Sequence, residues 1–166
     1  MKGYLPTYDG CIICGDRRVN PAAMHVRFYW DGEKIDTVVD TDKIYNGYEG
    51  IMHGGIITAL LDEAMGWAVA VERKCYFVTG ELQIRFVKPV KTNGKLRLIT
   101  RCVEHLVKYS VAEGKLLDSE GKLLAKAQGK FFEIPYREAL KIKKQMKFRD
   151  GDLDTLVNPE EDAKNV

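Results

Sequence analysis

The sequence has 166 residues, of which 45% are hydrophobic and 30% charged, and its formal net charge is +2. These values favour one globular domain with a sizeable core, and they exclude the strongly basic surface typical of nucleic-acid binding. The first residues, MKGYLPTYDG, lack the apolar stretch of a signal peptide. We therefore expect a cytoplasmic protein that binds neither nucleic acid nor a membrane.

An irregular segment, residues 1–23, opens the chain, because proline and glycine interrupt it repeatedly. It contains Cys11 and Cys14 in a CxxC spacing, which is half of a possible zinc site. A structural zinc site needs four ligands, and no second CxxC follows. We therefore expect no metal, and interpret the pair as a tight turn that holds two small buried thiols.

Two strands are predicted next. Residues 24–30 alternate and are rich in aromatic side chains, an Asp-Gly pair then indicates a turn, and residues 35–41 are expected to pair back as a hairpin. Residues 42–52 are a loop with three glycine or asparagine positions that favour turns. This loop leads directly into the most informative stretch of the chain.

Residues from His53 to about Arg73 are apolar almost throughout, apart from Thr58, Asp62 and Glu63. The stretch is longer than a strand, so we predict a helix, and it is apolar nearly all round, so most of its sides are expected to be buried. Two carboxylates near its middle would then face low dielectric, where an ionised group is costly without partners. Charge at the centre also argues against a membrane span.

Four strands are predicted after this helix, and short turns between them favour antiparallel pairing in a meander. One long helix against such a sheet is an α+β architecture, in which a curled sheet of about six strands wraps the helix. The domain is expected to span residues 24–135, with a polar helix over 136–149 and an acidic, disordered tail over 150–166. The four predicted strands cover residues 76–88, 95–107, 109–118 and 122–134.

The stretch GYEGIMHGGIITALLDEAMGWA resembles the hot-dog-fold acyl-CoA thioesterases of the PaaI-like, 4-hydroxybenzoyl-CoA thioesterase-type branch. In that branch a His-Gly-Gly begins the central helix and a catalytic Asp follows on it; the matching residues are His53, Gly54, Gly55 and Asp62. VTGELQIRFVKPV is similar to the next strand of the family. Relatives often carry Asn six positions before the His, where this chain has Gly47.

The resemblance covers about residues 11–134 and implies hydrolysis of an acyl-CoA to free acid and CoA. The first turn of a helix has backbone N–H groups without intrahelical partners, so the Gly55 N–H is expected to polarise the thioester carbonyl, and Gly54 lets a ligand approach closely. Asp62 would either activate water as a general base or attack the carbonyl directly, and both routes stay open. Two plainer alternatives need no catalysis. Gly54 and Gly55 would then serve only to allow a tight entry into the helix, and Asp62 would be a buried acid that caps a neighbouring segment or pairs with an arginine.

Other side chains are candidates for supporting roles. His53 either orients the thioester or only caps the helix, and Thr79 would position the water or the acid, as a Ser or Thr does in relatives. Glu63 lies about 100° round the helix from Asp62, so it is the reserve acid or a structural hydrogen-bonding group. We expect Tyr48, with Met65 and Trp67, to help shape the acyl slot. The candidates for the CoA phosphates are Arg85, Lys88 and Lys91.

The resemblance also implies an active site between two subunits, and hence a homodimer or a dimer of dimers. No metal or redox cofactor is expected, since coenzyme A is part of the substrate. Two alternatives stay open: a non-catalytic acyl-CoA-binding hot-dog module, and a hot-dog dehydratase, whose chemistry pairs a His with an acid across the cleft.

Overall fold

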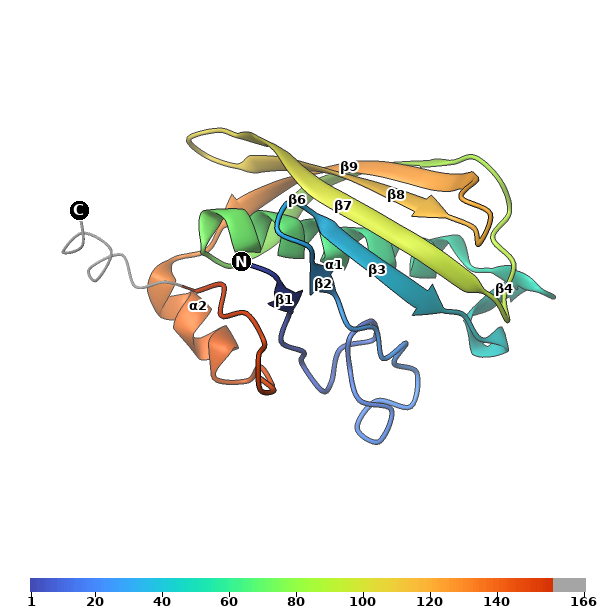
Figure 1. The fold of residues 1–166 in the computed structure, drawn as a ribbon, viewed down its shortest axis with the longest axis horizontal. Helices are drawn as coiled ribbons and strands as arrows, with labels where there is room; N and C mark the ends of the chain where they lie inside the picture. Colours follow the sequence, from blue (N-terminus) through green and yellow to red (C-terminus); the bar gives the residue numbers. More distant parts are fainter. Residues whose placement is uncertain (157–166) are drawn as a thin grey trace.

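One long helix, α1 (Gly54–Arg73), lies against a large antiparallel sheet in the computed structural model, which describes residues 1–156 (Figure 1). The helix begins after His53 and ends at Lys74, whose φ of 55° is left-handed. Its Leu60, Leu61 and Met65 side chains are completely buried, and Leu61 and Met65 pack against β8 (Ser110–Leu117) of the sheet. By length and hydropathy alone α1 could cross a membrane, but half of that window is buried in the fold, and this packing accounts for its apolar composition. The predicted helix is therefore confirmed.

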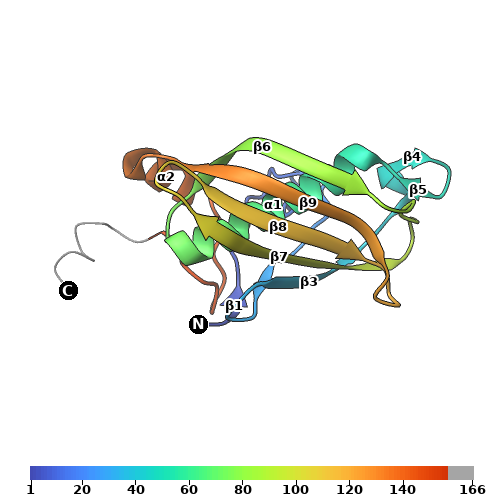
Figure 2. The same ribbon diagram turned by 90° about the horizontal axis from the view of Figure 1, so that it is seen from above.

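The sheet has seven strands in the order β1-β2-β3-β7-β8-β9-β6, and α1 runs beneath it (Figure 2). All neighbouring pairs are antiparallel, and α1 has contacts with every long strand. The fold is therefore α+β, as expected. Its strands are β1 (Gly3–Tyr4), β2 (Tyr29–Trp30), β3 (Ile35–Asp40), β6 (Phe77–Phe86), β7 (Lys95–His105), β8 (Ser110–Leu117) and β9 (Leu123–Glu133). A separate two-stranded ribbon, β4 (Asn46–Tyr48) and β5 (Ile51–Met52), precedes α1.

The predicted four-strand meander is correct for β7, β8 and β9 but wrong for β6. Instead of pairing with β7, β6 pairs with β9 and forms the edge of the sheet. The chain then crosses to β7 past the segment that precedes α1, where Met52 N–H donates to Val90 O at 2.8 Å and Thr92 N–H to Gly50 O at 3.1 Å. Strands that are neighbours in sequence often pair in a sheet, but they need not. The alternating pattern of a strand does not show which other strand it pairs with.

The predicted strand over residues 24–30 is mostly wrong, because only Tyr29–Trp30 joins the sheet. The preceding residues run alongside the CxxC turn instead: Met24 N–H donates to Ile12 O at 2.8 Å, and Val26 N–H to Ile13 O at 3.0 Å. An extended segment therefore is present, as its alternating pattern suggests, but its partner is a turn.

The C-terminal helix is shorter than predicted, and the segment that follows it is better packed than predicted. Helix α2 (Tyr136–Lys143) ends six residues before the expected end at Arg149. Within the predicted disordered tail, Leu153 and Leu156 are buried, and Asp152 pairs with Arg27 at 2.6 Å. Two leucines in an otherwise acidic stretch explain this docking, since they give it apolar surface to bury. The remainder of the predicted tail, 157–166, lies outside the described residues.

Replacing Leu153 with alanine should lower the free energy of unfolding by about 2 to 3 kcal/mol, because it removes a buried leucine and leaves a cavity. Its backbone N–H, which donates to Tyr4 O at 2.8 Å, would be kept. Denaturant titration followed by circular dichroism measures the change. Val107→Ala is the matched control, since Val107 is fully exposed, and should cost less than about 0.5 kcal/mol. Equal values for the two variants would show that the docked tail contributes nothing.

Candidate active site

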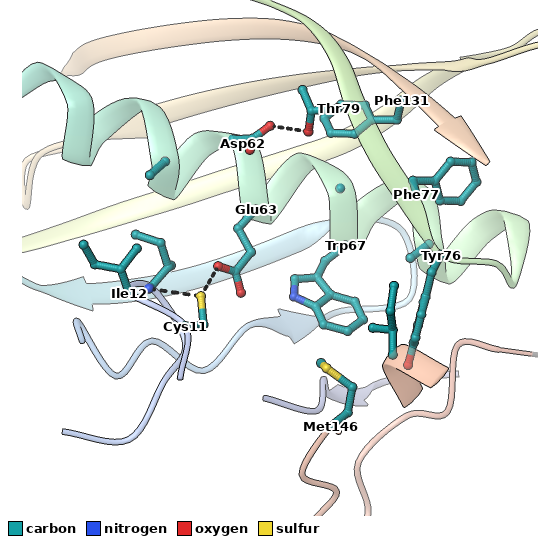
Figure 3. Close-up of a pocket in the computed structure, with 15 residues that line it drawn as sticks. Cys11, Ile12, Asp62, Glu63, Trp67, Tyr76, Phe77, Thr79, Phe131 and Met146 are labelled. Carbon is teal, nitrogen blue, oxygen red and sulfur yellow. Dashed lines mark hydrogen bonds between the residues drawn. The ribbon is translucent and has the colours of Figure 1, made fainter. Parts of the chain in front are cut away.

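A cavity of about 400 Å³ lies along the middle of α1. Its walls come from α1, from β6 and β9, from the N-terminal loop and from the C-terminal segment after β9 (Figure 3). Much of the lining is apolar, including Trp67, Phe77 and Phe131. The cavity brings together the predicted polar residues Asp62, Glu63 and Thr79. Trp67, which the sequence predicts as a wall of the acyl slot, lines the same cavity. Two carboxylates and a hydroxyl thus share one largely apolar cavity.

Asp62 and Thr79 are directly hydrogen-bonded. The Thr79 hydroxyl donates to Asp62 Oδ1 at 2.7 Å, joining β6 to α1. The β6 ladder is irregular between Thr79 and Glu81, and a Cβ on the intervening Gly80 would lie 2.3 Å from the Phe132 ring. A larger residue at this bulge would displace the Phe132 ring from its present position, and bulges commonly re-aim a neighbouring side chain. Asp62 Oδ2 accepts no hydrogen bond from residues 1–156, so one carboxylate oxygen is available for chemistry.

Glu63 points away from Asp62, toward the N-terminal loop, as their separation around the helix predicts (Figure 3). Cys11 Sγ and Glu63 Oε2 share a hydrogen bond of 3.0 Å. Burial, followed by the charge of Cys11, raises the pKa of Glu63 to about 8. Two hydrogen bonds lower the pKa of Cys11 to about 5. The larger effect comes from the Cys14 side chain and the smaller one from Glu63. Glu63 is thus part of a partly buried acidic cluster with the CxxC pair, in which only Cys14 is fully buried.

The start of α1 holds the other predicted catalytic groups. His53 is the N-cap, and its Nδ1 accepts the Gly55 N–H at 2.9 Å, so in a neutral ring the proton lies on Nε2. The predicted carbonyl-polarising donor is therefore engaged by His53 in this structure. The preceding Gly54 N–H donates to no atom of the described residues. None of these three residues lines the Asp62 cavity.

Asp62 follows Gly54 by eight residues, which places it about 12 Å farther along the helix axis. A thioester carbonyl is polarised through a hydrogen bond of about 3 Å and must also lie near the attacking group. One chain therefore does not bring the helix N-terminus and Asp62 to the same carbonyl.

The predicted phosphate-binding residues separate into two places. Lys88 and Lys91 line a second cavity, of about 810 Å³, near the loop that enters α1. Arg85 lines a different one, opposite Lys126 on β9. Tyr48 is 83% exposed on the β4–β5 ribbon and lines neither the Asp62 cavity nor that of Lys88, whereas Met65 is entirely in the core.

Comparison with known proteins shows which proteins this chain is similar to. Residues 49–125 match the thioesterase superfamily. The match spans α1 and strands β6 to β8, so the central part of this chain is similar to that superfamily. A candidate esterase of Saccharolobus solfataricus is 33% identical over 90 residues, which cover 54% of this chain and 58% of the relative. The chain thus spans less than two thirds of this curated relative.

Solved structures of the thioesterase superfamily share the architecture. One superfamily protein superposes with a TM-score of 0.68 at 22% identity, covering 76% of this chain and 61% of that one. A Bacillus halodurans protein crystallised with CoA has a TM-score of 0.53 at 32% identity, covering 59% of this chain and 70% of its own. The hot-dog fold expected from the HGG stretch is therefore confirmed.

Sequence reasoning missed the contact between Cys11 and Glu63. These residues are 52 positions apart, and neither spacing nor periodicity links a loop cysteine to a helix glutamate. It also missed Phe131 and Tyr76 as cavity walls, since an aromatic residue in a strand is ordinarily core.

Proposed function

We propose that this protein is a member of the thioesterase superfamily and hydrolyses an acyl-CoA thioester to a free acid and CoA, in the manner of the PaaI-like branch. The observation that carries the proposal is the Asp62 carboxylate, held by Thr79 at 2.7 Å and opening on a largely apolar cavity of about 400 Å³. Such a cavity suits an acyl group with a few polar groups beside it. The CoA found in the Bacillus halodurans structure supports the choice of thiol.

Asp62 supplies the attacking group. The Thr79 hydroxyl fixes one carboxylate oxygen, so that Oδ2 faces the substrate. From this position Asp62 removes a proton from an attacking water, or attacks the carbonyl itself to form an anhydride that water then cleaves. In both routes Thr79 acts as a positioning residue, because it holds the acid and does not itself react.

The start of α1 supplies the electrophilic side of the reaction. The Gly55 N–H, with the positive end of the helix dipole, receives the carbonyl oxygen as it gains charge. One such donor contributes about 3 kcal/mol to the transition state. Because His53 Nδ1 occupies this N–H at 2.9 Å, the His53 ring turns away or shares the bond when substrate binds. Gly54 leaves room for that approach.

Gly55 and Asp62 lie about 10 Å apart along the helix axis, which leads us to propose a homodimer whose site lies between subunits. In it, Asp62 of one chain faces Gly55 of its partner. The β6 edge is the proposed contact, because a free edge strand offers unpaired backbone groups to a second strand. Exposed Val78, Phe86 and Val87 lie on or beside this edge and would be covered.

Lys88 and Lys91 are the proposed contacts for the CoA phosphates. They line a cavity of about 810 Å³ that also includes Ile51, three residues before α1 begins. Ammonium groups there would meet the nucleotide end of CoA while the thioester reaches the helix N-terminus. The cytoplasmic location expected from the sequence stays a prediction.

The purified protein is expected to release free thiol from acyl-CoAs. A panel of acetyl, medium-chain, long-chain and aromatic acyl-CoAs, followed with a thiol reagent, measures turnover and ranks the acyl groups. Tight acyl-CoA binding without thiol release would support the binding-module alternative and contradict hydrolysis. Loss of water from a 3-hydroxyacyl-CoA, followed by the absorbance of the enoyl product, would instead support a dehydratase.

A further inference from the structure

Three potential metal ligands meet where the N-terminal loop packs against α1. The Sγ atoms of Cys11 and Cys14 and a carboxylate oxygen of Glu63 all lie within 4.8 Å of one another. Cys11 Sγ is 3.0 Å from Glu63 Oε2 (Figure 3). Cys14 is 3% exposed. The proposed hydrolysis uses none of these side chains, since Glu63 points away from Asp62.

The loop is built to present both sulfur atoms. Cys11 Sγ accepts the Ile13 N–H at 3.2 Å, and Cys14 Sγ accepts the Tyr8 N–H at 3.5 Å. Backbone donors to sulfur favour the thiolate, which is the form that binds metal. The turn is closed by Gly15, whose N–H donates to Cys11 O at 3.1 Å. A Cβ at Gly15 would lie 2.1 Å from that same oxygen, so no other residue allows this closure.

Close spacing and partial burial make this cluster unfavourable as a set of three anions. Thiolates and carboxylates that are close together in low dielectric repel one another, so protons must remain on some of them. A divalent cation at their centre would replace those protons and let all three groups ionise. Zinc, with bonds of about 2.3 Å to sulfur and about 2.0 Å to oxygen, fits donor atoms separated by less than 4.8 Å.

We propose that Cys11, Cys14 and Glu63 bind one Zn²⁺ ion, whose fourth coordination position is open to the cavity. Two sulfur ligands select zinc over magnesium and calcium, which prefer oxygen alone. Cys11 and Glu63 line the cavity, whereas Cys14 does not, so the free position faces inward and takes a water molecule.

The ion joins the N-terminal loop to the middle of α1. It thereby fixes the wall of the cavity on the side opposite Asp62, to which Ile12 and Ile13 also belong. Zinc is expected to raise the melting temperature, because the ligands come from segments that separate on unfolding. This proposal does not depend on the proposed hydrolysis, since it concerns binding alone.

The first test is the metal content of the whole chain. Reduced protein is loaded with zinc, dialysed, and measured by mass spectrometry; we expect one zinc per chain. Apo-protein titrated with Co²⁺ should give a thiolate-to-metal charge-transfer band and the strong visible absorption of a four-coordinate site. Cys11→Ser should abolish the band, and Glu63→Gln should weaken zinc binding at least tenfold.

The matched control is the pair of cysteines outside this cluster. The double variant Cys75→Ser, Cys102→Ser should keep the zinc and the Co²⁺ spectrum. This variant also removes a second, more exposed cluster, formed by Glu72, Cys102 and His105. If folded, reduced wild-type protein gives no charge-transfer band with Co²⁺, the proposal is wrong whether or not the variants fold. Metal that survives Cys11→Ser but is lost from the double variant would equally overturn it.

Discussion

Asp62→Asn is expected to lower the rate of acyl-CoA hydrolysis about 10³-fold, within the range that general bases contribute. Asparagine has the same shape and keeps an oxygen that can accept the Thr79 hydroxyl, now 2.7 Å from Asp62 Oδ1. It cannot, however, take a proton from water or attack a carbonyl. Initial rates of thiol release with the best acyl-CoA of the panel give kcat/KM for both proteins.

The control for this variant is Glu72→Gln, which neutralises an acid on the same helix but outside the Asp62 cavity. It should keep activity within about twofold of the wild type, since surface changes away from a site are usually small in effect. Melting curves of both variants show whether the fold is intact. Undiminished hydrolysis by folded Asp62→Asn would remove Asp62 from the mechanism and leave Glu63 as the next acid to test.

A hybrid dimer of two inactive variants should recover about half the activity of the wild-type dimer. One chain carries Asp62→Asn, and the other carries Gly55→Pro, which removes the proposed N–H donor. Because a twofold dimer has two equivalent sites between its chains, each hybrid keeps one site with both groups intact. Proline is tolerated in the first turn of a helix, where Gly55 lies, since its N–H has no backbone partner there.

Co-expression with two different tags and tandem purification isolates the hybrid, and thiol release measures it against each homodimer. Gly55→Ala is the control, because it adds a methyl group near the His53 ring but keeps the N–H. It should lose far less activity than Gly55→Pro. A hybrid no more active than its two parents would contradict a site shared between chains, even if each single variant behaves as expected.

The sequence predicts the central helix well because composition alone decides it. From Ile56 to Val71 few polar side chains interrupt the run, so only a buried helix accommodates it. The proximity of Asp62 and Thr79 is also predictable, because the HGG stretch and the strand after it resemble the same family. These signals are local, and each lies within one or two neighbouring elements.

What the sequence does not predict depends on pairing between distant segments. Alternation in residues 77–86 indicates a strand but does not choose β9 over β7 as its partner. Likewise, the pattern of Met24, Val26 and Phe28 indicates an extended chain but cannot show that a cysteine turn lies beside it. Glu63 and Cys11 meet for the same reason: tertiary packing, which periodicity does not encode, brings them together.

The position of β6 has a consequence for how the protein assembles. Its only partner within residues 1–156 is β9, whose pairing with β6 runs from Ala125 to Glu133. During synthesis, α1 and β6 therefore leave the ribosome well before the strand that places Thr79 against Asp62. Contacts of such long sequence separation form slowly, because the intervening chain must first be ordered. The wall that holds the acid is thus among the last parts of the domain to be completed, and a nascent chain stopped before residue 125 would carry Asp62 without it.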